Sequence, residues 1–139
     1  MLLVDAHAGA SKIHGLGLIA GEFIPKGTLI WRFQPGFDVA VREEDYQKLP
    51  RNAQRGLDYY SYHCKAAGLY ILSSDDDRFT NHAEDPNSIF VDGVTVATRD
   101  ILPGDEVTMN YDEFQDLPAL PRELMEQLLG TSKLEPAPH

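Results

Sequence analysis

The chain has 139 residues, of which 22 are Asp or Glu and 12 are Lys or Arg, so that its formal net charge is −10 at pH 7. This length is that of one domain with a hydrophobic core, and a content of 42% hydrophobic and 24% charged residues excludes a disordered or fibrous chain. The acidity argues against direct nucleic-acid binding, because neutralisation of phosphate charge supplies most of the non-specific affinity for nucleic acids.

Short β-prone segments separated by turn signals dominate the chain. The predicted strands cover residues 17–20, 28–33, 69–72, 88–91, 94–98 and 106–109. Asp92-Gly93 lies between two of these strands and predicts a hairpin. Helices are predicted over residues 42–49, which stop before a proline, and over residues 121–129, which stop before a glycine. The sequence therefore predicts a mostly β fold with few helices.

Cys64 is the only cysteine, which excludes an intramolecular disulfide and a multi-cysteine zinc site. We interpret it as a small buried hydrophobic residue in a reducing compartment rather than as a nucleophile. The apolar run over residues 1–4 ends at Asp5 and is too short for a signal peptide or a membrane span. We therefore expect a soluble intracellular protein without a membrane partner.

Three motifs are candidates for chemistry. The first, Gly15-Leu16-Gly17 after a histidine, would expose backbone N–H and C=O groups to a ligand, although a tight turn before a strand has the same composition. The second is Arg-Phe-Thr-Asn-His at residues 78–82, followed by Pro-Asn at residues 86–87. The third spans residues 104–111, where a turn leads into a short strand that ends in a tyrosine.

Each of the last two motifs also has a structural interpretation. Asn81 and His82 could bind a ligand, form a hydrogen-bonded network, or join Asp85 and His63 at a metal ion. A zinc site needs three or four ligands, so we predict no metal site. Tyr111 could be a half-buried ring with a hydrogen-bonded hydroxyl.

In their order and spacing, the motifs resemble those of the SET domain, the family of protein lysine methyltransferases. Gly15-Leu16-Gly17 is similar to the family's first Gly-x-Gly turn. Residues 78–87 are similar to its Arg-Phe-x-Asn-His-Ser-x-x-Pro-Asn signature, and residues 104–111 to its Gly-Glu-Glu-Leu-Thr-x-Asp-Tyr signature. The resemblance covers about residues 11–114, which is most of the chain.

The resemblance implies a SET-domain (β-clip-like) fold of several small sheets with few helices and a C-terminal pseudoknot. Residues 1–115 would form the SET domain, and residues 116–139 a helical segment and tail that complete it. The implied activity is transfer of the methyl group of S-adenosylmethionine to a lysine ε-amine. A non-catalytic binding module and a methyltransferase for a non-histone amine are the alternatives.

The resemblance also implies roles for individual residues. The cofactor would be held by Gly15, Leu16, Gly17, Arg78, Asn81, His82, Tyr111 and Phe114. Tyr111 would be the catalytic tyrosine beside the transferring methyl group. Because the sulfonium already activates this group, positioning matters more than acid–base power. Loss of solvent around the target lysine would favour its neutral, nucleophilic form.

A lysine channel lined by aromatic rings is a further implication, because ring faces attract ammonium groups. Tyr60 and Phe90 are the candidates, with Tyr62 in the same Tyr-Ser-Tyr run, which resembles the family's Tyr-x-Phe strand, although core residues would have the same composition. The residue two positions before Tyr111 is Met109 rather than the aromatic residue of many members. A channel bounded by Phe90 lacks a hydroxyl that would restrict it, which favours more than one methyl per lysine.

Some features depart from the family pattern and bear on partners. Ala83 occupies the position where the family usually has Ser or Cys, and Asn110 the position where it usually has Asp. The cysteine-rich zinc-binding flanks of many relatives are absent. The cofactor and lysine sites would then need either the apolar helix predicted within residues 117–129 or a second subunit, so a homodimer is one arrangement that completes the site.

The acidity fits a basic, lysine-containing protein or peptide substrate, such as a histone. Residues 1–65 hold 7 acids and 8 bases, whereas residues 66–139, with two of the motifs, hold 15 acids and 4 bases. An acidic rim beside the site would attract such a substrate, although a merely solubilising face would have the same composition. The implied location is cytoplasmic or chromatin-associated, which means nuclear in a eukaryote.

Overall fold

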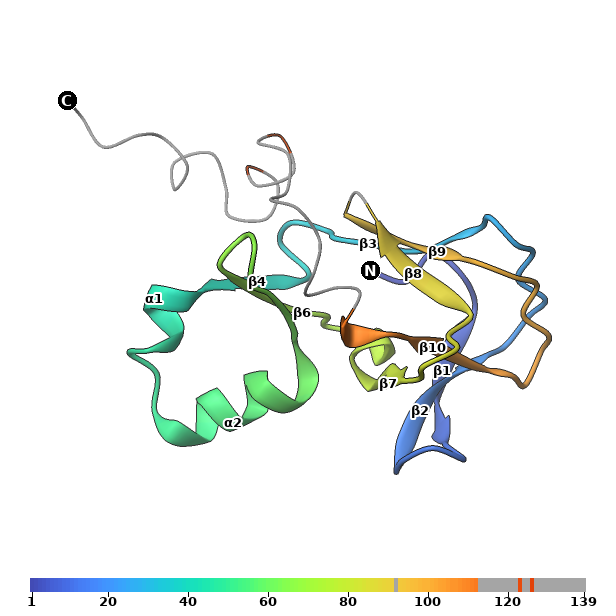
Figure 1. The fold of residues 1–139 in the computed structure, drawn as a ribbon, viewed down its shortest axis with the longest axis horizontal. Helices are drawn as coiled ribbons and strands as arrows, with labels where there is room; N and C mark the ends of the chain where they lie inside the picture. Colours follow the sequence, from blue (N-terminus) through green and yellow to red (C-terminus); the bar gives the residue numbers. More distant parts are fainter. Residues whose placement is uncertain (92, 113–122, 124–125, 127–139) are drawn as a thin grey trace.

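The computed structural model describes residues 1–91, 93–112, 123 and 126, which form two sheets with short helices between their strands (Figure 1). The strands are β1 (Ala6–Ala10), β2 (Leu16–Ala20), β3 (Leu29–Arg32), β4 (Val39–Arg42), β5 (Tyr62–Cys64), β6 (Leu69–Leu72), β7 (Asn81–His82), β8 (Ser88–Val91), β9 (Val94–Ala97) and β10 (Glu106–Met109). The helices within the described part are α1 (Glu43–Tyr46), α2 (Arg51–Tyr60) and the 3-10 helix η1 (Asp76–Phe79). The predicted mostly β fold with few helices is confirmed.

The larger sheet brings the three sequence motifs together. Its strand order is β1-β2-β10-β8-β9-β3, with β7 also paired to β10. Strand β10 runs antiparallel to β2 but parallel to both β7 and β8. The strand that leads to Tyr111 therefore pairs both with the strand that begins in the glycine turn and with the strand formed by Asn81 and His82.

The predicted strands of this sheet follow local sequence signals closely. Strands β8 and β10 have the predicted bounds, as does β6 in the smaller sheet, whereas β2, β3 and β9 differ by one or two residues. The predicted hairpin is also confirmed, because Val91 pairs with Val94 and Gly93 has a φ of 83°. A positive φ of this kind is the conformation that an Asp-Gly hairpin turn requires of its glycine.

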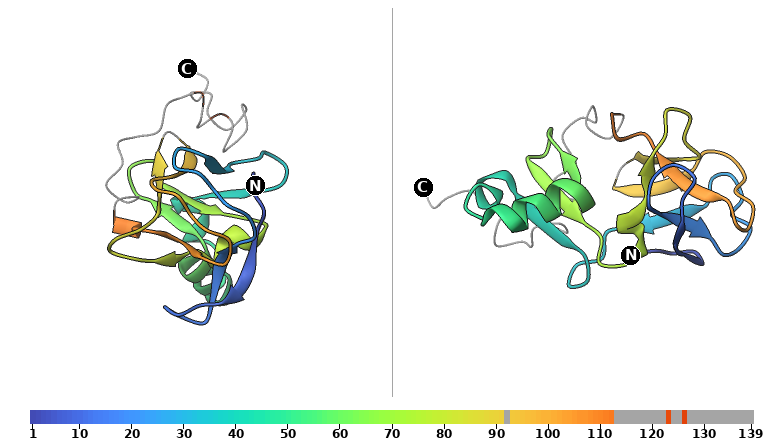
Figure 2. Two further views of the ribbon diagram at one scale, coloured as in Figure 1. Left: turned by 90° about the vertical axis from the view of Figure 1, so that its right-hand side faces the viewer. Right: turned by 90° about the horizontal axis from the view of Figure 1, so that it is seen from below.

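A smaller sheet with the order β4-β6-β5 forms, with α1 and α2, a lobe beside the larger sheet (Figures 1 and 2). The lobe contains a stack of three rings, with the buried Tyr70 in the middle. The Tyr70 ring centroid lies 4.3 Å from that of Tyr46 and 4.1 Å from that of His63. These rings tie α1 to β5 and β6 and hold the lobe together by side-chain contacts.

In this lobe the sequence predictions were partly wrong. The helix predicted over residues 42–49 is confined to α1, and α2 was not predicted, although its apolar residues Ala53, Leu57 and Tyr60 have the spacing of one helix face in an otherwise polar segment. Tyr60 and Tyr62 do not share a strand: Tyr60 ends α2 and Tyr62 begins β5. The helix predicted over residues 121–129, the domain boundary at 115 and the threading of the C-terminal segment fall at least in part outside the described residues and stay predictions.

One hydrophobic core extends from the larger sheet into the smaller one. Its buried residues are Leu18, Ala20, Ile24, Ile30, Trp31, Phe33, Tyr62, Cys64, Leu69, Ile71, Phe90, Ala97, Ile101, Val107 and Met109. The interpretation of Cys64 as a buried hydrophobic residue is confirmed, and burial raises the pKa of its thiol. No helix in the described part of the chain is long and apolar enough to span a membrane.

Candidate active site

An open cavity of about 480 Å³ lies where the three motifs meet. The residues that line it are Ile13, His14, Leu16, Tyr59, Tyr60, Arg78, Phe79, Thr80, Asn81, His82 and Tyr111. Small-molecule sites in proteins span roughly 300 to 1,000 Å³, so this cavity has the size of a site for a drug-sized or nucleotide-sized ligand. The predicted residues Leu16, Tyr60, Arg78, Asn81, His82 and Tyr111 are thus brought together on one wall.

The two glycines of the turn, Gly15 and Gly17, have different structural roles. Gly15 has a φ of +48°, in the left-handed region that glycine adopts without strain. Gly17 has ordinary backbone angles, but a Cβ there would lie 2.5 Å from a carboxylate oxygen of Glu106. Neither glycine lines the cavity; together they allow the turn to place His14 and Leu16 against it.

Asn81 fastens this turn to the middle of the sheet. The four oxygens within hydrogen-bond distance of its Nδ2 are Ser11 Oγ at 3.1 Å, the His14 carbonyl at 3.1 Å, the Leu16 carbonyl at 3.0 Å and Glu106 Oε2 at 2.9 Å. The amide has only two protons for these four acceptors. At least two of the oxygens are therefore left with spare capacity to accept hydrogen bonds beside the cavity.

His82 and Asn87 fix the position of β10 and of the tyrosine that follows it. The backbone N–H of Tyr111 donates to His82 Nδ1 at 3.1 Å, which requires that this nitrogen carry no proton, so the neutral ring is protonated at Nε2. The Asn87 side chain donates to the Glu106 carbonyl and accepts from the Thr108 N–H, each at 2.9 Å. The Pro-Asn part of the second motif thus extends the ladder along β10.

Tyr111 closes the inner end of the cavity with a neutral hydroxyl. This hydroxyl donates to the Thr80 carbonyl, and the ring centroid lies 5.8 Å from those of both His82 and Tyr62. Burial, together with the negative charge of Asp77, holds the pKa of Tyr111 well above its ordinary value. The group is therefore a phenol at neutral pH, and with its proton engaged by Thr80 its oxygen is left as an acceptor.

Asp77, which sequence reasoning considered only as one of the acids of a possible rim, lies directly behind this wall. Its carboxylate is buried and accepts hydrogen bonds from Tyr62 Oη at 3.0 Å and Ser73 Oγ at 2.6 Å. Burial raises its pKa to about 6, although both hydrogen bonds oppose the rise. In the sequence it is one of three consecutive Asp residues before the Arg-Phe pair, and nothing local distinguishes the buried one.

An aromatic and cationic rim forms the outer part of the cavity. The Arg78 guanidinium lies 5.8 Å from the centroid of the Tyr60 ring. The Tyr60 ring also makes edge-to-face contacts with Tyr59 and Phe79, with centroid distances of 4.8 Å and 5.9 Å. Tyr59 and His14 line the cavity but were not predicted as site residues. Tyr59 is 65% exposed. This rim offers ring faces to a planar ligand group and a guanidinium to an anionic one.

Three predicted residues of the described part do not line the cavity, namely Gly15, Gly17 and Phe90. Phe90 is 3% exposed and packs in the core, with its ring centroid 6.3 Å from that of Trp31. Its role in a lysine channel, like that of Tyr60, stays a prediction. Phe114 lies outside the described residues, so its contact with the cofactor also stays a prediction.

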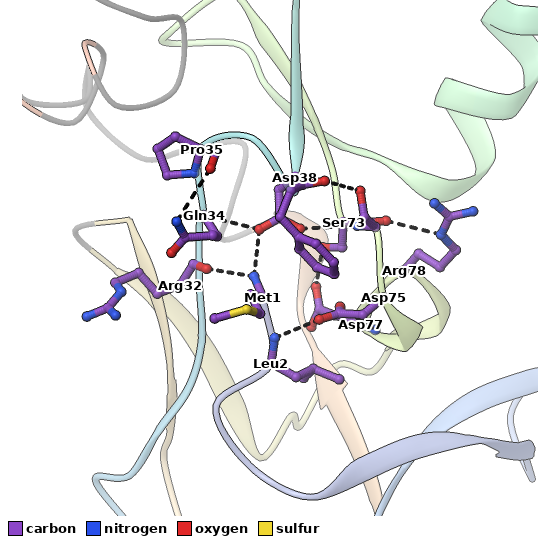
Figure 3. A network of polar contacts seen from close by, with 12 residues as sticks. Met1, Leu2, Arg32, Gln34, Pro35, Asp38, Ser73, Asp75, Asp77 and Arg78 are labelled. Atoms are coloured by element: carbon purple, nitrogen blue, oxygen red, sulfur yellow. Dashed lines mark hydrogen bonds and ion pairs between the residues drawn. The ribbon is translucent and has the colours of Figure 1, made fainter.

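Asp75 and Asp76 serve the fold rather than an open rim, and Figure 3 shows Asp75 bound to Leu2. Asp75 accepts from the backbone N–H of Leu2 at 2.7 Å, and Asp76 accepts from that of Ala8 at 2.9 Å. A substrate-attracting rim therefore has to come from other acids, such as the exposed Glu84 and Asp85.

No metal-binding group is found in the described part of the chain, where no three His, Cys, Asp or Glu side chains cluster suitably. His63, considered above as a ligand, is paired with Glu43 at 2.7 Å in the smaller lobe. The absence of a metal from the reaction stays a prediction.

Comparisons with known proteins agree with this geometry. The family model of the SET domain matches residues 15–112, and the chain therefore belongs to the SET domain family. It is similar in fold to a Plasmodium falciparum protein described as a candidate histone methyltransferase, at 24% identity and a TM-score of 0.56 over 79% of this chain and 95% of that one. No curated protein matches the sequence.

A second solved structure with the same fold is a humanized mutant of the Chaetomium thermophilum Polycomb Repressive Complex 2, bound to an inhibitor. It is 23% identical with a TM-score of 0.59, and the match covers 81% of this chain but 16% of that one. At 24% and 23% identity, these two structures show that the chain has the fold of the SET domain family.

Proposed function

We propose that the protein is a protein-lysine N-methyltransferase that uses S-adenosylmethionine and acts on a basic, histone-like protein. The observation that carries this proposal is Tyr111: a phenol kept neutral at the inner end of the cavity, with its proton donated to Thr80 and its oxygen free to accept. Such an oxygen aligns a polarised methyl group through weak C–H···O contacts without acting as a base.

The groups around the cavity fit this cofactor chemically. The amino group of the cofactor would find acceptors in the His14 and Leu16 carbonyls, which share the Asn81 amide with two other oxygens. Arg78 would face an anionic group, and the rings of the rim would contact the adenine. When bound, S-adenosylmethionine supplies an activated methyl group on a sulfonium, which is transferred directly to the amine.

The chain's own residues then have to position and desolvate the reactants. The target lysine must lose its proton, and a channel of buried aromatic residues favours the neutral amine. Tyr111 is held by His82 at its backbone and by Thr80 at its hydroxyl, so its oxygen has a fixed position before any ligand arrives. Preorganisation of this kind is what a displacement at an activated methyl group requires.

The first test measures transfer of labelled methyl groups from S-adenosylmethionine to histones and other lysine-rich proteins. We expect Tyr111→Phe to lower kcat by about a hundredfold, the size of effect that loss of one aligned polar group has in an active site. Affinity for the cofactor should change little. Tyr46→Phe is the matched control, because it removes a hydroxyl in the smaller lobe, where Tyr46 bonds Asp58 at 2.7 Å.

The outcomes of this test separate the alternatives. Cofactor binding without transfer to any protein would favour a non-catalytic binding module, and transfer only to small amines would favour a different substrate class. A Tyr111→Phe variant as active as wild type would contradict the role of the tyrosine. The mass of the product lysine reports how many methyl groups are added.

A second measurement addresses the basic substrate. If acids such as Glu84 and Asp85 attract it, KM should rise steeply between low and physiological salt, because screening weakens attraction between exposed charges. A KM that is independent of salt would indicate that the acidity serves solubility alone.

A further inference from the structure

Asp77 has an environment that the proposed reaction does not explain. Its side chain is 1% exposed, and the groups that donate hydrogen bonds to its carboxylate are neutral hydroxyls, those of Tyr62, Ser73 and, at 3.5 Å, Thr80. Among the described residues, no Lys, Arg or ammonium group lies within ion-pair distance of its carboxylate. A buried charge without an ionic partner costs solvation free energy, so this arrangement does not serve stability.

Two residues connect the carboxylate to the cavity, namely Tyr62 and Thr80. Tyr62, which donates to it, has its ring centroid 5.8 Å from that of Tyr111. Thr80, which lines the cavity, has its hydroxyl 3.5 Å from Asp77 Oδ1 and donates to the Asp77 carbonyl at 2.7 Å. The charge of Asp77 also raises the pKa of Tyr111, so its electric field reaches the cavity wall.

We propose that Asp77 makes the cavity selective for charge, so that its carboxylate favours the sulfonium cation of S-adenosylmethionine over the neutral thioether product, S-adenosylhomocysteine. This inference rests on the proposed function. When the methyl group leaves, the sulfur regains its lone pair and the positive charge passes to the amine nitrogen. The thioether left in the cavity has then lost its attraction to the carboxylate, which favours binding of substrate over retention of product.

The ionisation of Asp77 gives this selectivity a pH dependence. Its pKa is about 6, so the carboxylate is charged at neutral pH and protonated in mild acid. The groups that face it from neighbouring elements are Tyr62, Ser73, Thr80, Tyr111, the Met1 ammonium, and Asp75 and Arg78 of its own segment. His82, in ring contact with Tyr111, is a second titratable group at the cavity, and a variant of Asp77 separates the two.

The test compares the affinities of the two ligands by calorimetry, for wild type, Asp77→Asn and Asp45→Asn. Asp45 is an exposed residue of α1 in the smaller lobe, so its variant makes the same charge change away from the cavity. At about pH 7.5 we expect the ratio of the affinities for S-adenosylmethionine and S-adenosylhomocysteine to be about tenfold lower in Asp77→Asn than in wild type. This is a modest effect for one charge acting on another inside a protein. Asp45→Asn should keep the wild-type ratio.

At about pH 5, wild type should show the same low ratio as Asp77→Asn, because its carboxyl is then protonated. Equal ratios for wild type and Asp77→Asn at neutral pH would overturn the inference while leaving the proposed function intact. Failure of wild type to bind either ligand would instead overturn the proposed function, and this inference with it. If Asp77→Asn does not fold, Tyr62→Phe takes its place: it removes a donor to Asp77 and should move the pH at which the wild-type ratio changes, whereas an unmoved midpoint would overturn the inference.

Proton release gives a second readout that a merely structural role would not produce. Binding of a cation beside Asp77 lowers the pKa of its carboxyl, so binding of S-adenosylmethionine at about pH 6 should release protons, measured as a dependence of the binding heat on the buffer. S-adenosylhomocysteine should release fewer. If Asp77→Asn releases as many protons as wild type when it binds S-adenosylmethionine, the protons come from His82 and the proposal is contradicted.

Discussion

Asp38 and Asp77 are two buried carboxylates of the same fold with opposite surroundings (Figure 3). Asp38 has a fully buried side chain and lies 2.6 Å from the Met1 ammonium, and it also accepts from the backbone N–H groups of Gln34 and Ser74. Asp77 accepts from neutral hydroxyls and lies behind the cavity wall. The comparison separates a charge that holds the chain together from a charge that serves a site.

The largest expected effect is on stability, from Asp38→Ala. This change leaves the donors of Met1, Gln34 and Ser74 without their acceptor, and we expect it to lower the free energy of unfolding by about 3 to 4 kcal/mol. Urea unfolding at neutral pH measures the change. Affinity for S-adenosylmethionine, measured where the variant is folded, should stay within about twofold of wild type, since Asp38 does not line the cavity. A large loss of affinity with unchanged stability would reverse the roles given to the two carboxylates.

Asp77→Asn should act in the opposite direction on stability. The folded state holds a proton on Asp77 between its ordinary pKa of 3.8 and its pKa of about 6, where the unfolded state has lost it. Unfolding free energy therefore falls as pH rises through this window and stays lower above it. Removing the charge should stabilise the protein by about 2 kcal/mol at neutral pH and flatten this dependence.

Urea denaturation from about pH 4 to pH 7.5 measures both effects. Asp45→Asn is again the control, because its carboxylate is exposed. A destabilised Asp77→Asn at neutral pH would show that the carboxylate serves the fold, as Asp38 does.

The same contrast explains what the sequence could predict. Strands β8 and β10 and the glycine turn depend on neighbouring residues, namely alternating apolar side chains, an Asp-Gly pair and glycines, so local patterns suffice. Helix α2 was missed although Ala53, Leu57 and Tyr60 have helical spacing, because the segment is otherwise polar and Leu57 is its one buried residue.

The site divides in the same way. Asn81, His82 and Tyr111 were predictable because their order in the motifs is distinctive. The role of Asp77 was not predictable, because the local sequence does not show which of three adjacent Asp side chains is buried. Asp75 accepts from Leu2 and Asp76 from Ala8, both far away in the chain, and only the tertiary structure leaves Asp77 to face Tyr62.

A smaller effect is expected from Tyr62→Phe, which keeps the ring beside Tyr111 but removes one donor to Asp77. The hydrogen bond from Tyr62 lowers the pKa of Asp77, so its loss should raise that pKa further above 6. The pH at which ligand preference changes should rise with it. A midpoint that stays in place would mean that Tyr62 does not support the carboxylate.

The smallest effect should come from Asp85→Asn, which provides an exposed carboxylate for comparison with the two buried ones. Its side chain is 92% exposed and lies 3.3 Å from Arg99 Nη1, while Nη2 of the same arginine donates to the Asp85 carbonyl at 2.7 Å. The backbone contact survives the substitution, and water replaces the lost ion pair at little cost. We therefore expect a change in Tm within about 1 °C. A shift of several degrees would show that exposure alone does not rank these carboxylates, and that the pair holds the loop before β8 against the end of β9.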